Sequence, residues 1–177
     1  MTRPVAPPSS QSGVRVATPQ GDARVVRYAA AAPWASVLLS HGAGGGLDAP
    51  DLVAAAAVLP SLGVEVVLVE QPWRVAGRRV ASPPPRLDEA FRAVVERVAP
   101  AVPYVVGGRS AGARVACRTG AALGAVAVLA LAFPLHPPGR PDRSRAGELT
   151  GARLPVAVVQ GSRDAFGSPA EVRRAVR

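Results

Sequence analysis

Short runs rich in Val, Leu and Ala alternate with helical stretches along most of this chain. Continuous apolar runs bounded by turn signals are typical of strands buried on both faces, and such strands separated by helices predict a mostly parallel sheet. We expect strands at residues 14–18, 24–28, 36–40, 64–70, 104–107, 126–132 and 155–160. We expect helices at residues 51–60, 87–98, 111–119 and after Pro169. The first two strands, separated by the turn residues 19–22, predict an antiparallel hairpin at one edge. The fold class is therefore α/β, with helices flanking the sheet.

The length of 177 residues fits one domain. Residues 1–13 are rich in Pro and Ser and predict a flexible leader, so the single domain would span residues 14–177. One cysteine rules out a disulfide framework, and two histidines leave too few soft ligands for a four-ligand zinc site. The chain has no lysine, so no P-loop can be completed. We expect no metal and no cofactor.

A formal charge of +9 raises the question of nucleic-acid binding. The arginines occur singly or in pairs along the whole chain, with no basic run and few aromatic residues on which bases could stack. We therefore expect no specific nucleic-acid partner. The most apolar stretch, residues 121–135, is interrupted by Gly124 and Pro134 and is too short to span a bilayer. With no signal peptide visible, we expect a cytoplasmic protein that does not associate with membranes.

The pentapeptide G-R-S-A-G at residues 108–112 lies directly between an expected strand and an expected helix. A G-x-S-x-G sequence in that context is typical of a nucleophile elbow, in which glycines permit a sharp turn and the serine hydroxyl projects from the edge of the sheet. Ser110 is therefore the candidate nucleophile. The alternative is a glycine-rich turn whose serine only caps the helix.

A serine nucleophile needs N–H donors for the oxyanion that it creates. The loop that begins at His41 and continues through three consecutive glycines follows an earlier strand and can supply one donor, for which we nominate Ala43, with Gly44 next. The second donor is the N–H of Ala111, the residue after the nucleophile. His41 is more often a structural hydrogen-bonding residue of such a loop than a proton-transfer base.

Three further side chains follow strands at the same edge of the sheet. Asp164 follows a late strand, where an acid that orients a histidine is expected, although an Asp that satisfies a turn backbone is the common alternative. His136 follows the strand next to that of the elbow, and Arg74 follows residues 64–70. His41, His136 and Arg74 are candidate substrate contacts.

Five segments occur in order along the chain: SHGAGGG, VEQPWRVAGRR, VVGGRSAGARVA, FPLHPPGRP and VVQGSRDAFG. In this set the chain resembles the small α/β-hydrolase family related to dienelactone hydrolase, whose members include bacterial predicted hydrolases and a eukaryotic chromatin-complex subunit. The resemblance covers about residues 14–177. It implies an α/β-hydrolase-like fold, Ser110 as nucleophile, Asp164 as acid and residues 42–44 as the oxyanion loop.

One part of the family pattern is absent. The resemblance implies a further strand and a catalytic histidine after Asp164, but no histidine follows Asp164 in this chain. We therefore expect a domain that lacks its last strand and helix, as in a C-terminally truncated product. Whether His136 or His41 can replace the missing base stays open. Without a base a serine hydroxyl is a poor nucleophile, so we expect the chain to be inactive or very weak.

Three functions remain as hypotheses. The first is hydrolysis of an ester or related acyl bond in a small molecule by a serine hydrolase, as a monomer or homodimer. The second is a non-catalytic binding scaffold with the same pocket. The third is a dinucleotide-binding, Rossmann-like domain, because residues 44–49 satisfy G-x-G-x-x-A after a strand and Glu70 ends the next strand.

Overall fold

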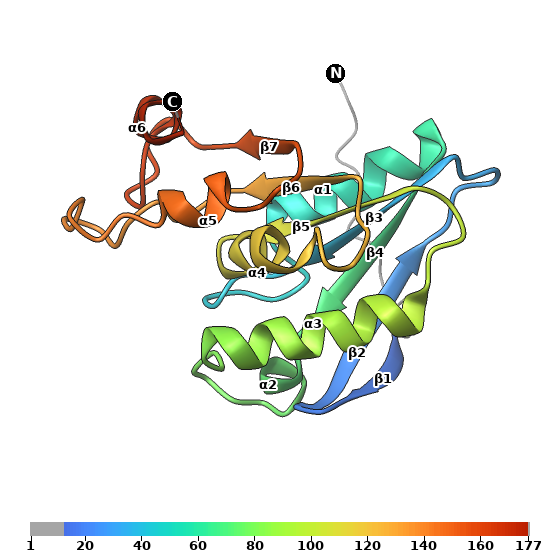
Figure 1. Cartoon of the computed structure of the whole chain (residues 1–177). Coiled ribbons are helices and arrows are strands. Elements are labelled where there is room, and N and C mark those ends of the chain that lie inside the picture. The colour runs from blue at the N-terminus through green and yellow to red at the C-terminus, as the bar shows by residue number, and fades with distance from the viewer. Residues whose placement is uncertain (1–12, 177) are drawn as a thin grey trace, which may run out of the picture.

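Seven strands form one sheet in the order β1-β2-β4-β3-β5-β6-β7 (Figure 1). The computed structural model describes residues 13–176. The strands are β1 (Val14–Thr18), β2 (Gly21–Tyr28), β3 (Ala35–Ser40), β4 (Val64–Glu70), β5 (Tyr104–Arg109), β6 (Ala127–Leu131) and β7 (Val156–Val159). β1 pairs with β2 and β2 with β4 in antiparallel register, whereas β3 to β7 are parallel. The predicted fold class, including the antiparallel hairpin at the edge, is confirmed.

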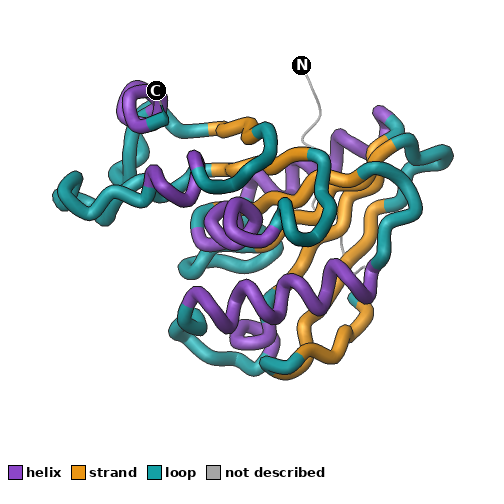
Figure 2. Tube along the Cα trace, in the orientation of Figure 1, coloured by secondary structure: helices purple, strands orange, loops and turns teal. Residues whose placement is uncertain are grey.

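Helices cover the two faces of the sheet unequally (Figures 1 and 2). The helices are α1 (Pro50–Val58), α2 (Pro72–Val75), α3 (Pro84–Val98), α4 (Ala111–Thr119), α5 (Ala146–Thr150) and α6 (Pro169–Ala175), with a 3-10 helix, η1 (Leu59–Leu62), after α1. One buried cluster joins the sheet to α3, α4, α5 and α6. The other joins the opposite face to α1 and to Leu59 of η1.

Helix α3 shows why these segments are helical. Its buried residues recur at the spacing of one helical face. They are Leu87, Asp88, Ala90, Phe91, Val94 and Val95. The helix begins at Pro84, three residues earlier than the sequence predicts, because proline has no N–H to leave unpaired and fits the first turn of a helix.

The remaining differences from the sequence predictions are local. The short helices α2 and α5 were not predicted, since four or five residues give too little periodicity to detect. Strand β5 continues to Arg109, two residues beyond its expected end. Residue 107 of this strand has to be glycine, because a Cβ there would be 2.3 Å from the Leu129 carbonyl oxygen of β6. Glycine here permits close packing of neighbouring strands rather than ending one.

The predicted leader, residues 1–13, lies outside the described residues apart from Gly13. Among residues 13–176 there is no helix with the length and apolarity needed to cross a bilayer.

Candidate active site

Ser110 lies at the sharp turn between β5 and α4. Its backbone angles, φ 52° and ψ −107°, are unfavourable for a residue with a side chain. Its N–H donates to the Leu131 carbonyl at 2.9 Å, which fixes the turn to the end of β6. Its hydroxyl makes no capping hydrogen bond to α4, so the bond that defines a helix cap is lacking. The predicted strand, turn and helix are present around Ser110, while its role as nucleophile stays a prediction.

Glycines around the turn permit very close backbone contacts. A Cβ at Gly108 or at Gly112 would lie 2.3 Å from the Ser40 carbonyl oxygen, at the end of β3. A Cβ at Gly42 would lie 3.2 Å from the Ser110 Cβ and 3.9 Å from its Oγ. The loop after β3 therefore packs directly against the serine, and larger residues would push the two apart.

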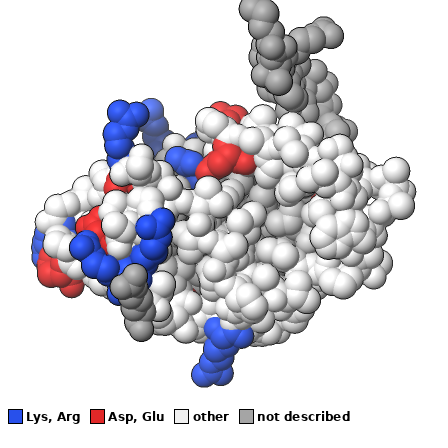
Figure 3. Space-filling model, turned by 90° about the horizontal axis from the view of Figure 1, so that it is seen from above, with Lys and Arg blue, Asp and Glu red and all other residues white. Residues whose placement is uncertain are grey.

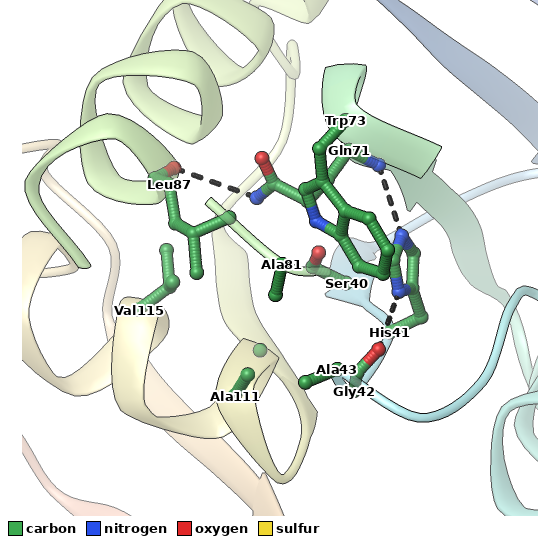
Figure 4. A pocket seen from close by; sticks show the side chains of 11 residues that line it. Ser40, His41, Gly42, Ala43, Gln71, Trp73, Ala81, Leu87, Ala111 and Val115 are labelled. Atoms are coloured by element: carbon green, nitrogen blue, oxygen red, sulfur yellow. Dashed lines mark hydrogen bonds between the residues drawn. The ribbon is translucent and has the colours of Figure 1, made fainter. Parts of the chain in front are cut away.

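The candidate oxyanion donors lie on both sides of this contact. Ala43 and Ala111 both line a small pocket beside the turn, whereas Gly44, which is exposed like Ala43, is not among the lining residues (Figure 4). The Ala111 N–H is the first in α4 and has no acceptor within the helix. Free N–H groups at a helix N-terminus favour negative charge. Of the three donors predicted from sequence, Ala43 and Ala111 line the pocket and Gly44 does not, while the donor role of all three stays a prediction.

His41 is buried and both of its ring nitrogens are occupied. Nδ1 lies 2.8 Å from the Gly42 carbonyl oxygen, and Nε2 lies 3.0 Å from the main-chain nitrogen of Gln71. A carbonyl only accepts and a main-chain N–H only donates, so Nδ1 carries the proton and Nε2 is the acceptor. Burial lowers the pKa of His41 below its usual 6.5. The rings of His41 and Trp73 pack edge to face, with their centroids 5.5 Å apart. His41 is a neutral support for the loop, with no free nitrogen to accept a proton from Ser110.

The pocket beside the turn is largely apolar and holds two polar atoms without partners. Its lining residues are Ser40, His41, Gly42, Ala43, Gln71, Trp73, Ala81, Leu87, Ala111, Gly112 and Val115. Among the described residues, Ser40 Oγ and Gln71 Oε1 have no hydrogen-bond partner. The empty volume of about 200 Å³ includes open solvent, so the site is small. The sequence analysis did not predict Ser40 or Gln71 as site residues, although Ser40 is the last residue of β3 and Gln71 is the first residue after β4.

Asp164 lies in the loop after β7 and is half-buried. Its Oδ1 accepts from the Phe166 N–H at 2.9 Å and its Oδ2 from Gln160 Nε2 at 3.0 Å. These bonds match the turn-stabilising alternative. Each carboxylate oxygen has a second lone pair, so an acid role stays open to Asp164.

His136 is also buried, at the start of the segment after β6. Its Nδ1 lies 2.9 Å from the Pro137 carbonyl oxygen, and its Nε2 is 3.5 Å from Glu171 Oε1 of α6. Its main-chain N–H donates to the Phe166 carbonyl at 3.1 Å, beside the Asp164 loop. Among the described residues, no hydrogen bond joins either histidine to Ser110.

Two arginines lie near the loop after β3. Arg109 pairs with Asp51 of α1 at 2.5 Å. Arg74 is exposed, and its guanidinium lies over Gly46, where a Cβ would be 3.5 Å from one of its nitrogens. Arg74 forms no ion pair with the residues that the structure describes, so its charge is available near the pocket residue Trp73.

The features of a dinucleotide site do not come together. Helix α1 begins at Pro50, four residues after the last glycine of the loop, so its N-terminus is displaced from the glycines. Glu70 is engaged by Arg24 of β2 at 2.7 Å rather than free to bind a ribose. Residues 13–176 contain no cluster of three or more His, Cys, Asp or Glu side chains that could hold a metal ion.

The mostly parallel seven-stranded sheet with its antiparallel N-terminal pair is the fold of an α/β-hydrolase. The model of the family described as alpha/beta hydrolase domain matches residues 33–176, and the chain belongs to this family. No curated protein sequence matches the chain.

Several solved structures share the fold. An α/β serine hydrolase without a lid from Xanthomonas campestris is 25% identical, with a TM-score of 0.72 over 94% of this chain and 78% of that one. An α/β serine hydrolase homologue from Coxiella burnetii is 19% identical, with a TM-score of 0.75 over 93% and 80%. A dienelactone hydrolase from Anabaena variabilis is 13% identical, with a TM-score of 0.65 over 93% and 92%.

Proposed function

We propose that this chain carries a serine hydrolase site for an ester or related acyl bond, with Ser110 as the nucleophile. The observation that carries the proposal is the strained backbone of Ser110, held at the end of β5 against Gly42 and without a capping bond. Strain of this kind costs about 1–3 kcal/mol and persists where the surrounding structure enforces it, often at active sites.

The reaction follows from the arrangement of groups around the turn. Ser110 Oγ attacks the acyl carbon, and its proton passes to a base. The carbonyl oxygen becomes an oxyanion that accepts hydrogen bonds from the Ala43 and Ala111 N–H groups, with Gly44 as the alternative donor. Collapse expels the alcohol, which takes up a proton, and leaves an acyl-enzyme. Water then attacks the acyl-enzyme and releases the acid, without any cofactor.

The site is least complete at the base that would accept the Ser110 proton. His41 has both ring nitrogens engaged. His136 Nε2 lies 3.5 Å from Glu171 Oε1 and has no hydrogen-bond partner among the described residues, but no hydrogen bond joins it to Ser110. In our proposal Asp164 would orient a histidine that the described residues do not supply. Removing one member of a catalytic triad typically leaves about 10³–10⁴-fold catalysis over water. We therefore expect slow, Ser110-dependent acylation and very weak turnover.

The proposed substrate class rests on the size of the pocket and on the charge of Arg74. The small apolar pocket suits a short acyl group, and Arg74 lies nearby with an unpaired guanidinium among the described residues. Arg74 would contact an acidic group of a small-molecule substrate. His136, at the edge of the site, would contact the leaving group.

The test is hydrolysis of p-nitrophenyl acetate by the wild type and by Ser110→Ala, with and without added imidazole. Imidazole in solution can stand in for the missing base, and the variant corrects for its uncatalysed reaction. We expect a very low basal rate and an imidazole-dependent increase that is larger in the wild type. Equal rates in the two proteins under both conditions would exclude Ser110 as the nucleophile. Fast turnover by the wild type without imidazole would show that our account of the base is wrong.

A second candidate, a non-catalytic binding scaffold, is favoured by the engagement of both ring nitrogens of His41. It predicts a different result with a serine-directed fluorophosphonate probe. A nucleophilic Ser110 is labelled slowly, and the label is lost in Ser110→Ala. A scaffold gives no labelling in either protein over the same period.

A further inference from the structure

The pocket beside Ser110 contains two buried polar atoms that the proposed reaction does not use. Ser40 and Gln71 are 0% and 3% exposed. Among the described residues, neither Ser40 Oγ nor Gln71 Oε1 has a hydrogen-bond partner. A buried polar group without a partner costs free energy, so such groups are few in native proteins and the exceptions point to a bound group.

Ser40 lies at the carboxyl edge of the sheet, close to the candidate nucleophile. It is the last residue of β3 and pairs with Gly108 of β5, two residues before Ser110. Ala111, the residue after the nucleophile, lines the same pocket as Ser40. Because neighbouring strands are about 4.8 Å apart, an acyl chain of about three or four carbons on Ser110 can reach Ser40.

The two polar atoms lie among apolar side chains. Figure 4 shows the Ser40 hydroxyl in the middle of the pocket, between Trp73 on one side and Val115 on the other. Gln71 Nε2 donates to the Leu87 carbonyl oxygen at 3.4 Å. The opposite orientation of the amide would place two acceptors against each other, so Oε1 is the free acceptor. The Ser40 hydroxyl can both donate and accept.

The pocket is uncharged. The lining residues that the structure describes include no arginine, aspartate or glutamate, and His41 is neutral. Charged side chains gather mainly on the left of Figure 3, the side to which the carboxyl ends of β6 and β7 point in Figure 1. An ammonium or carboxylate group in the pocket would lose its hydration without gaining a counter-ion. A neutral polar group therefore fits the pocket best.

We propose that Ser40 and Gln71 select the acyl group of the substrate by binding a hydroxyl on it. The favoured acyl chains are short and neutral, and carry the hydroxyl on the second or third carbon. This hydroxyl donates to Gln71 Oε1 and shares a second hydrogen bond with Ser40 Oγ. Water can satisfy both atoms in the free protein, and a hydroxyl replaces its hydrogen bonds whereas a methyl group does not. The inference rests on the proposed function, since it concerns the acyl group that Ser110 would attack.

Pairs of p-nitrophenyl esters with acyl chains of equal length test this selection. The hydroxyacetyl ester is compared with the propanoyl ester, and the 3-hydroxypropanoyl ester with the butanoyl ester, because each pair exchanges a methyl group for a hydroxyl. Rates are measured with added imidazole, corrected with Ser110→Ala, and each ratio is divided by the ratio for imidazole alone. We expect at least one pair to favour the hydroxyl by at least about tenfold, since a methyl group leaves a buried acceptor unpaired.

Side-chain variants assign the preference to the two residues. Ser40→Ala and Gln71→Met should each reduce it at least about threefold. Gln71→Met keeps the main-chain N–H that binds His41. Ser36→Ala is the matched control, since Ser36 is also buried in β3 but its hydroxyl donates to Glu65 Oε2 at 3.0 Å, away from the pocket lining. This control should leave the preference unchanged.

Stability separates a binding role of Ser40 from a structural one. Ser40→Ala should not lower the urea midpoint, because the hydroxyl that it removes has no partner among the described residues. Ser36→Ala should lower the midpoint, because it leaves Glu65 without a hydrogen bond. An equal decrease in the two variants would mean that the Ser40 hydroxyl is engaged within the fold, against the proposal.

A binding measurement distinguishes failure of this inference from failure of the proposed function. Trp73 is buried and lines the pocket, so its fluorescence reports occupancy once the other tryptophan is removed by Trp34→Phe. In Ser110→Ala with this change, at least one of methyl hydroxyacetate and methyl 3-hydroxypropanoate should bind at least about tenfold more tightly than methyl propanoate or methyl butanoate. This preference without any Ser110-dependent hydrolysis would exclude the nucleophile but keep the pocket. A preference in neither measurement, or one that Ser40→Ala or Gln71→Met leaves unchanged, would overturn the inference.

Discussion

The imidazole Nε2 of His41 accepts a hydrogen bond from the main-chain N–H of Gln71 over 3.0 Å. This bond joins the loop after β3 to the first residue after β4. Since Nδ1 donates to Gly42, the same ring holds the loop against Ser110. Protonation of Nε2 would place two donors opposite each other, so the neutral ring is part of the folded structure.

The first prediction concerns pH. Burial lowers the pKa of His41 in the folded protein below 6.5, so the unfolded chain binds its proton more readily. The contribution of His41 to stability is therefore complete above about pH 6.5 and is lost as pH falls towards the folded pKa. Urea unfolding between about pH 7.5 and about pH 5 should show this decline. His41→Gln should be less stable at neutral pH but show a shallower decline, by up to about 1.4 kcal/mol per pH unit. Parallel curves for the two proteins would contradict this account.

The second prediction concerns strain at Ser110. Glycine adopts a positive φ without the steric cost that a side chain incurs. Ser110→Gly should therefore raise the free energy of unfolding by about 0.5–1 kcal/mol, whereas Ser110→Ala, which keeps a Cβ, should not. Urea titrations of the three proteins give the comparison. If Ser110→Gly is less stable than Ser110→Ala, the turn is not strained in solution.

Most of the fold could be predicted because its strands are buried on both faces. A continuous apolar run such as Val64–Glu70 is readily recognised as a buried strand. Helix α4 begins and ends where the sequence predicts. The errors occurred where local signals conflict. The predicted strand ended at Gly107, but β5 continues through Gly108 to Arg109, and the two glycines allow close packing against β6 and β3.

The site was less accessible to sequence reasoning. The G-x-S-x-G sequence predicted the strand, turn and helix around Ser110, because glycine spacing encodes a local geometry. The engagement of His41 with Gln71 depends on a contact between residues 30 positions apart, and the unpartnered atoms of Ser40 and Gln71 depend on packing around Trp73. No local pattern encodes such relationships.

The third prediction concerns Cys117. The thiol is buried in α4, and burial raises its pKa to about 12. A thiol reacts as the thiolate, so Cys117 should be inert to a disulfide reagent at about pH 8 in the native protein. In denaturant it should react completely with one equivalent. Rapid labelling of the native protein would mean that α4 opens readily or that the thiol is accessible.

The last prediction concerns the ion pairs that connect α3, α4 and α5. Arg118 binds both oxygens of Asp88, at 2.7 and 2.8 Å, and also contacts Glu148 at 3.0 Å. The side chains of Arg118 and Asp88 are only 22% and 12% exposed, so removing the guanidinium leaves a poorly solvated carboxylate. Arg118→Met should therefore lower the free energy of unfolding by about 2–3 kcal/mol, less than for a fully buried pair. Arg15→Met removes the exposed 3.4 Å pair with Asp22 and should change stability by less than about 0.5 kcal/mol. Chemical denaturation of both variants tests the difference, and equal effects would show that burial does not govern the strength of these pairs.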